Sequence, residues 1–266
     1  MKYITVMFAG ALTLVSLSAC QVSTSTSTST MPAAGRTVQN AANVPPQEAL
    51  TKAIKQLDTT AYNFSIKQGV MTGGGRVDSA AGTGAFGIGG DVDLGLGDGT
   101  KTRVSVAYTV IAPEFWIKAD FGDTINQHYG MNPTAWMHVD NSKITGAQIP
   151  LDKSGKLDTG ITDLLSDVAD VKRTDKTHYT GTIDVTGAEG IMAPTDAAAK
   201  KPGAKTLPFT ATVDEQNRLT VFTIDGASVD ENLAMELTFT SYGSIEKVTV
   251  PSGAIEAPDS VYELIG

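Results

Sequence analysis

Apolar residues at helical spacing mark the start of the folded part of the chain. Between residues 47 and 58, apolar side chains recur every three or four positions, with lysine and glutamine between them: Ala49, Leu50, Ala53, Ile54 and Leu57. This spacing predicts a helix with one apolar stripe, and the preceding Pro45-Pro46 is compatible with its first turn. A shorter helix is expected at residues 195–201, where Pro202-Gly203 would end it.

A second apolar stripe lies in the middle of the chain, between residues 158 and 171. It consists of Ile161, Leu164, Leu165 and Val168, and aspartates fall on the opposite side. We therefore predict an amphipathic helix in this segment, which packs its apolar side on a sheet.

Much of the remaining chain alternates between apolar and polar residues. Four stretches carry apolar residues at every second position: Tyr62, Phe64 and Ile66; Val104, Val106, Tyr108 and Val110; Leu207, Phe209, Ala211 and Val213; and Leu233, Met235, Leu237 and Phe239. Such alternation predicts strands with one apolar and one polar face. Gln216-Asn217 predicts a hairpin turn, and residues 242–244 predict another before a strand at 245–250. Strands that follow one another through short turns indicate an antiparallel meander, because a parallel sheet needs intervening helices.

The first twenty residues have the features of an export signal. Met1-Lys2 is a basic start, residues 4–17 are mostly apolar, and the small residues Ser18-Ala19 precede Cys20. The apolar run is shorter than the roughly 20 residues that a membrane-spanning helix needs. The segment from Leu17 to Cys20 resembles a bacterial lipobox, in which the chain is cut before the cysteine and the thiol receives a diacylglyceryl group.

A polar tract follows Cys20 and alternates serine with threonine through Thr30. A repetitive polar tract cannot bury enough surface to order itself, which argues against a buried core cysteine. We expect residues 1–19 to be a lipoprotein signal peptide, 20–45 a lipidated tether and 46–266 a single β-rich domain. Because two acyl chains anchor a protein stably, the expected location is the extracytoplasmic face of a cell membrane.

Composition and charge restrict the class of protein further. The 266 residues are 41% hydrophobic and 18% charged, so the chain has enough apolar material for a sizeable core. The net charge of −9 disfavours nucleic-acid binding, which requires clustered positive charge. The single cysteine excludes an internal disulfide, so packing and hydrogen bonds must hold the fold together.

Motifs for nucleotide or calcium binding are incomplete. The segment from Gly82 to Gly87 spells G-x-G-x-x-G, but more glycine follows where a nucleotide site requires a helix. Asp91, Asp93 and Asp98 resemble part of a calcium loop, but Gly95 stands where an oxygen ligand is needed. A polar hairpin tip is the better interpretation of these aspartates.

The histidines and serines give no sign of catalysis. His128, His138 and His178 are neither four residues apart nor beside the cysteine, so a zinc ligand set is missing, and His178 is expected at the surface of a strand. The sequence contains no G-x-S-x-G segment of the kind that carries a serine nucleophile. We therefore predict no enzyme activity, no cofactor and no metal.

A family resemblance is carried by four segments taken in order: residues 135–139 with Trp136, the helical stretch 159–168, the strand at 177–184, and Phe239 to Gly243 before Val248 to Pro251. From about residue 62 to 258, the chain resembles the actinobacterial LppX/LprG-type lipoproteins, whose relatives include the LolA-like lipid carriers. The resemblance implies an α+β fold, with a strongly curved antiparallel β-sheet in the form of a half-barrel and helices that cover its concave face. It also implies an apolar cavity for acyl chains.

This interpretation leads to a candidate site for a lipid or glycolipid. The expected lining consists of Phe64, Ile66, Val104, Val106, Tyr108, Leu164, Leu165, Val168, Ile183, Met235, Leu237 and Phe239. Pockets for apolar ligands are mostly hydrophobic with few polar anchors, which this inventory can build. The alternative is a non-enzymatic interaction or regulatory lipoprotein in which the same residues pack as a solid core. The sequence identifies no protein partner.

Overall fold

The structure, a computed structural model, describes residues 44–93, 101–144, 149–188, 194 and 196–265. The expected signal peptide, Cys20 and nearly all of the expected tether lie outside the described residues, as do Gly95 and Asp98. Residues 40–266 form one compact unit, and every residue of the hydrophobic core belongs to it.

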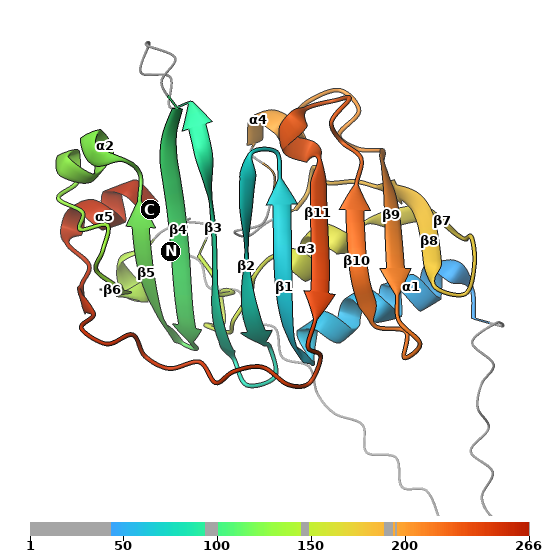
Figure 1. The fold of residues 1–266 in the computed structure, drawn as a ribbon, viewed down its shortest axis with the longest axis horizontal. Coiled ribbons are helices and arrows are strands. Elements are labelled where there is room, and N and C mark those ends of the chain that lie inside the picture. Colours follow the sequence, from blue (N-terminus) through green and yellow to red (C-terminus); the bar gives the residue numbers. More distant parts are fainter. Residues whose placement is uncertain (1–43, 94–100, 145–148, 189–193, 195, 266) are drawn as a thin grey trace, which may run out of the picture. The chain divides into compact units, whose positions relative to one another are not determined.

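A single twelve-stranded sheet organises the described residues (Figure 1). Its strands, in the order of the chain, are β1 Ala61–Gln68, β2 Met71–Asp78, β3 Thr83–Asp93, β4 Lys101–Ile111, β5 Glu114–Asp120, β6 Met137–Val139, β7 Val168–Arg173, β8 His178–Ile183, β9 Leu207–Val213, β10 Leu219–Ile224, β11 Met235–Thr240 and β12 Ile255–Glu256. The spatial order is β12-β6-β5-β4-β3-β2-β1-β11-β10-β9-β8-β7. The sheet is open, since its two edge strands, β12 and β7, do not pair with each other. Every neighbouring pair is antiparallel except β12 with β6, which confirms the predicted antiparallel sheet and the α+β class. The predicted meander holds within β1–β6 and within β7–β11, but β1 and β11, distant in the chain, join the two halves.

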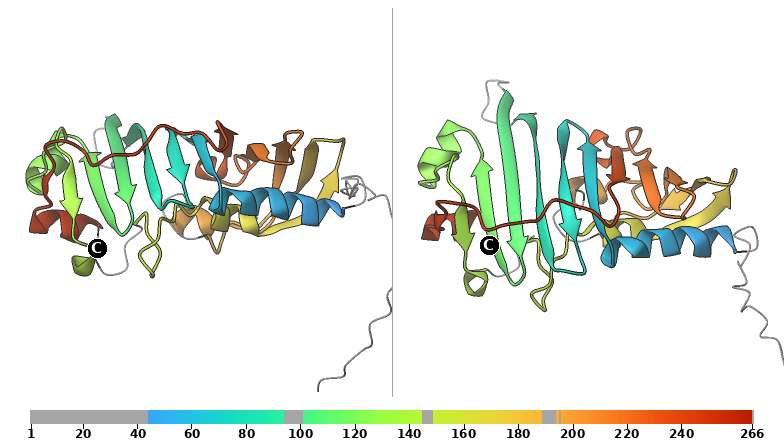
Figure 2. Two further views of the ribbon diagram at one scale, coloured as in Figure 1. Left: turned by 90° about the horizontal axis from the view of Figure 1, so that it is seen from below. Right: turned by 60° about the horizontal axis from the view of Figure 1, so that its bottom comes forward.

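The helices in the described residues are short: α1 Pro46–Lys55, α2 Asp123–His128, α3 Ile161–Ser166, α4 Asp196–Ala199 and α5 Asp259–Ile265, with 3-10 turns at Gln56–Asp58, Asn141–Lys143 and Glu231–Leu233. Figure 2 shows α1 on one side of the sheet and the chain after β11 on the other. Helix α1 contacts β7, β10 and α3. We call the side that carries α1 and α3 the helix face and the opposite side the open face.

The two outer predicted helices are confirmed, and their positions follow from burial. Helix α1 buries Ala49, Leu50, Ala53 and Ile54, which are residues of the predicted stripe. The Gln47 amide donates a 2.7 Å hydrogen bond to the Val168 carbonyl, so α1 also caps part of the β7 edge. Helix α4 lies where the third helix was predicted.

The middle helix is shorter than predicted. Helix α3 ends at Ser166, Asp167 leaves the helical region with φ −87° and ψ 45°, and Val168 begins strand β7. Val168 pairs with Ile183 of β8, so the sheet supplies the backbone partners that a continued helix would have supplied. The Val168 side chain is nevertheless buried in the hydrophobic core, as the apolar stripe predicted.

The strand predicted at residues 245–250 does not form. Strand β11 already has β1 on one side and β10 on the other, so neither of its edges can accept a hairpin partner. The chain instead crosses the open face, where Glu246 lies 3.4 Å from Arg76 of β2 and Val248 is buried, and reaches β6 as β12. The predicted hairpin between β9 and β10 is confirmed, with Asn217 at φ 57° in its turn.

Two glycines of β2 lie where a side chain would meet the backbone of β3. A Cβ atom at Gly73 would lie 2.1 Å from the Gly87 carbonyl oxygen, and one at Gly75 would lie 2.2 Å from that of Ala85. Real Cβ atoms do not come so close to backbone, so these positions require glycine. The G-x-G-x-x-G segment therefore lies in a turn and in strand β3, where its glycines serve strand packing.

Candidate functional site

The residues predicted to line an apolar site lie on the helix face or on elements packed against it. Eleven of the twelve belong to one hydrophobic cluster or pack directly on it: Phe64, Ile66, Val106, Tyr108, Leu164, Leu165, Val168, Ile183, Met235, Leu237 and Phe239. Val104 is buried but lies outside this cluster. The structure therefore brings the predicted set together, with that single exception.

Ten of the twelve predicted residues are buried, and only Val106 and Tyr108 are partly exposed, so burial differs along the helix face. Beneath the helices, Leu165, Leu237 and Phe222 have no exposed surface, so side chains fill that region. On β3 and β4, Ile88, Val106 and Tyr108 remain partly exposed although they pack against the same cluster. We call the group Phe86, Ile88, Val106 and Tyr108 the β3–β4 apolar surface.

Register explains how this surface is assembled. Phe64, Gly75, Phe86 and Tyr108 lie opposite one another across β1, β2, β3 and β4. Because Gly75 has no side chain, Phe64 and Phe86 meet above it with ring centroids 6.2 Å apart, and Phe86 lies 5.6 Å from Tyr108. The result is a row of three aromatic rings that crosses four strands.

Loops as well as helices lie against the helix face near this surface. Leu157, in the loop between β6 and α3, comes within 3.4 Å of the position that a Cβ of Gly84 would occupy. A bridge between Leu151 and Leu157 closes that loop into a small hairpin, and Asp152 accepts backbone hydrogen bonds from Ser154 and Lys156 within it. These hydrogen bonds, the one from Lys156 most of all, lower the pKa of Asp152.

Tyr108 brings the one polar group of the β3–β4 apolar surface. Burial of the hydroxyl end raises the pKa of Tyr108 to about 12. The phenol is neutral at physiological pH, as in any tyrosine, and can donate or accept a hydrogen bond. Sequence reasoning missed Phe86 and Ile88, although they alternate with Ala85 and Gly87 as a strand requires. The surrounding glycines concealed that alternation.

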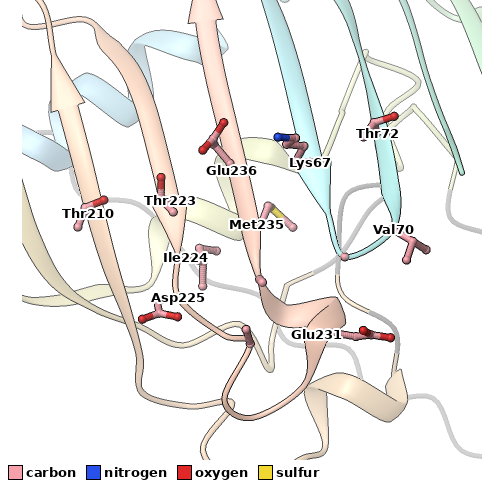
Figure 3. Close-up of a pocket in the computed structure, with 13 residues that line it drawn as sticks. Lys67, Val70, Thr72, Thr210, Thr223, Ile224, Asp225, Glu231, Met235 and Glu236 are labelled. Carbon is pink, nitrogen blue, oxygen red and sulfur yellow. The ribbon is translucent and has the colours of Figure 1, made fainter.

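A separate groove of about 780 Å³ lies on the open face, at the ends of β1, β2, β10 and β11 (Figure 3). Its charged lining residues are Lys67, Asp225, Glu231 and Glu236, so carboxylates predominate. Lys67 and Glu236 are register partners on adjacent strands. Threonines from three strands, Thr72, Thr210 and Thr223, complete its polar lining, so the groove offers both polar and apolar contacts.

The histidines are spread over three elements. His178 is exposed at the start of β8, as predicted, and its Nδ1 lies 2.8 Å from the Asp175 carboxylate. His128 is the last residue of α2, and its ring packs edge-on against the ring of Tyr129, which follows the helix. His138 in β6 lies between two carboxylates, with Nε2 2.6 Å from Glu114 and Nδ1 3.2 Å from Glu256. Within the described residues, no group of three or more histidine, cysteine or acidic side chains is placed to hold a metal ion.

His138 fastens the end of the chain to the sheet. Glu256 belongs to β12, which pairs with β6, while Glu114 belongs to β5, so the imidazole joins three strands. The hydrogen bond to Glu114 raises the pKa of His138 most, Glu256 adds to it, and desolvation opposes both. Since both ring nitrogens face carboxylates, the doubly protonated ring satisfies both contacts.

Comparisons with known proteins add no assignment. Among the residues that the structure describes, no helix has the length and apolar character needed to cross a membrane. Neither a family model nor a curated protein matches the chain.

Proposed function

We propose that this protein is a lipid-anchored extracytoplasmic lipoprotein whose folded domain binds an acyl chain of a lipid or glycolipid, without catalysis. In this proposal the anchor is the diacylated Cys20, and the open sheet corresponds to the half-barrel of the LppX/LprG-type lipoproteins, with α1 and α3 on its concave face. The acyl chain lies against the β3–β4 apolar surface.

The observation that carries the proposal is the change in burial along the helix face. Leu237 and Phe222 are fully buried beneath the helices, whereas Ile88, Val106 and Tyr108 keep exposed area on the same face. Apolar side chains that remain accessible beside a closed core are the type of surface that binds apolar ligands. The Tyr108 hydroxyl supplies one polar anchor, which suits a ligand with a carbonyl or hydroxyl beside its acyl chain.

A non-enzymatic interaction or regulatory role is the second candidate. It is favoured by the burial of ten of the twelve predicted lining residues, all except Val106 and Tyr108, because a closed core then accounts for most of the set. On this view the partly exposed residues of β3 and β4 contact a protein partner or the neighbouring loops.

Lipid retention by the soluble domain distinguishes the two candidates. The chain without residues 1–20 retains the whole compact unit and is purified, examined by native mass spectrometry and then extracted with organic solvent. The proposal predicts a bound lipid that extraction removes. It also predicts that a neutral fluorescent diacylglycerol binds the extracted protein.

Two matched variants test the position of the site. Val106→Trp places a large ring on the β3–β4 apolar surface and should reduce diacylglycerol binding at least tenfold. Ser105→Trp places the same ring on the open face of the same strand, where Ser105 is exposed, and should leave binding unchanged. Ile88→Phe is a smaller change that reports on the same surface if Val106→Trp does not fold. Absence of lipid from the purified protein together with no binding of the probe would exclude the lipid-carrier function.

A further inference from the structure

The chain between β11 and α5 crosses the open face with few attachments (Figure 2). We call residues 244–256 the C-terminal strap. Between residues 245 and 254, no backbone hydrogen bond joins the strap to a strand in the part of the chain that the structure describes. Glu246 pairs with Arg76 and Val248 is buried, whereas Val250 is 55% exposed. We propose that the C-terminal strap is closed while His138 carries both of its protons and opens when the ring loses one.

The chain on either side of the C-terminal strap is firmly attached. Before it, the Gly243 amide donates to the Ala61 carbonyl at 2.7 Å. After it, Ala257 and Val261 are buried in the hydrophobic core. The strap can therefore move between two fixed points, and α5 does not have to leave the sheet.

Opening of the strap breaks few contacts. Strand β12 is the edge strand of the sheet and pairs with β6 over only two residues. The Ile255 amide donates to the Trp136 carbonyl at 2.9 Å, and the Ile255 side chain is 48% exposed. The Glu256 carboxylate lies 3.2 Å from His138 Nδ1 and is the charged attachment of this strand. This ionic contact is therefore a large part of what holds the end of the strap.

The closed strap also leaves one polar group unsatisfied. Nη1 of Arg76 lies 3.4 Å from Glu246, but Nε of Arg76 is buried and has no hydrogen-bond partner among the described residues. A buried donor without a partner destabilises the arrangement that encloses it. Few contacts thus stabilise the closed strap and one group opposes it, so a change in a single ionic contact can shift the balance between closed and open.

The two ring nitrogens of His138 explain why the contact with Glu256 depends on pH. Nε2 lies 2.6 Å from Glu114, and Nδ1 lies 3.2 Å from Glu256. The doubly protonated ring donates to both carboxylates. A neutral ring keeps one proton, and the shorter contact with Glu114 favours Nε2 for it. Nδ1 then turns a lone pair toward the Glu256 carboxylate, and the two groups repel each other.

The other charged groups near His138 do not replace this contact. Asp140, in the turn after β6, interacts with the charge of His138. The ammonium of Lys143 is 3.1 Å from Asp259, and that of Lys118 lies over an indole ring. Carboxylates thus approach His138 from β5, from β12 and from the turn after β6, while the nearby lysines are engaged with other groups. The strap is therefore closed at low pH and open at high pH.

A single cysteine in the strap measures its opening. The chain without residues 1–20 retains the compact unit and lacks the only native thiol, so Val248→Cys introduces one buried thiol. Val250→Cys is the matched control, because it lies two residues further on and is exposed. Both variants are labelled with a neutral maleimide from about pH 5.5 to about pH 9, and the ratio of the two rates cancels the titration of the thiol itself.

The ratio of the two labelling rates should follow the charge of His138. It should rise about fivefold as His138 loses its proton, which is the size expected for a largely exposed ionic contact. The midpoint of this rise should coincide with the pKa of His138 measured by NMR of the imidazole. His138→Gln cannot be protonated and should give the high ratio at every pH. His178→Gln removes a histidine that pairs with a carboxylate elsewhere and should leave the pH dependence unchanged.

Three results would overturn the proposal: a ratio that does not change with pH, a change that persists in His138→Gln, or a change that is lost in His178→Gln. If His138→Gln does not fold, Glu256→Gln removes the same contact from the exposed side and should also give the high ratio at low pH. The proposal is independent of acyl-chain binding, because the β3–β4 apolar surface lies on the other face of the sheet. Binding of neutral diacylglycerol should be unchanged in His138→Gln, so the two proposals fail separately.

Discussion

Truncation of two residues on the same face of the sheet should have very different costs. Leu237 in β11 is fully buried, with Ile66 and Phe222 as its register partners. Leu→Ala in a closed core costs about 3 to 5 kcal/mol, because the lost transfer free energy is joined by the cost of the cavity. Val106→Ala removes two carbon atoms from a partly exposed side chain, so only about 1 kcal/mol is expected from the transfer free energy.

Thermal unfolding followed by circular dichroism measures this difference. For a domain of this size, each 1 kcal/mol shifts the midpoint by about 2 to 4 °C, so Leu237→Ala should lower it by about 6 to 20 °C. The Val106→Ala variant should lose only about 2 to 4 °C. Both are measured on extracted protein, because a bound lipid would stabilise the folded state by mass action. Equal losses in the two variants would mean that Val106 lies in a closed core and that the β3–β4 apolar surface does not differ from the region around Leu237.

Three further predictions concern the anchor, the His138 contact and the glycine strands. Cys20→Ala should abolish incorporation of an alkyne fatty acid, because the thioether requires the sulfur, and labelling equal to that of the unchanged protein would disprove the anchor. The pKa of His138 is raised above 6.5 in the folded state, so the contribution of this histidine to stability should be complete below pH 6.5 and be lost as the pH rises through the raised value. Urea midpoints measured across this range should show the loss. His138→Gln should abolish this pH dependence. Gly75→Ala should lower the free energy of unfolding by about 1 to 3 kcal/mol or more, because the added Cβ would lie 2.2 Å from the Ala85 carbonyl oxygen. Gly187→Ala is the control, since that position faces open space, and should change the free energy of unfolding by no more than about 0.5 kcal/mol. Urea denaturation measures both.

The sequence by itself determined the elements whose periodicity reports a single buried face. The stripe of α1 and the alternation of β1, β4, β9 and β11 could be recognised because each apolar side chain faces one core. The meander followed from short turns between such strands. The same patterns predicted which side of each element is apolar, and eleven of the twelve predicted lining residues lie in or against one cluster.

Only the tertiary structure decided the features that depend on neighbours distant in the chain. The segment at 245–250 looks like a strand, but β1 and β10 already occupy both edges of β11, which no local pattern reveals. Val168 fits a helical stripe and a strand equally well, and pairing with Ile183 decides for the strand. The row of rings from Phe64 to Tyr108 exists because Gly75 leaves space between the strands that carry them. The contacts of His138 with Glu114 and Glu256 arise because three strands meet at one edge of the sheet. Periodicity reports which side of an element is apolar, whereas strand order and register determine what that side meets.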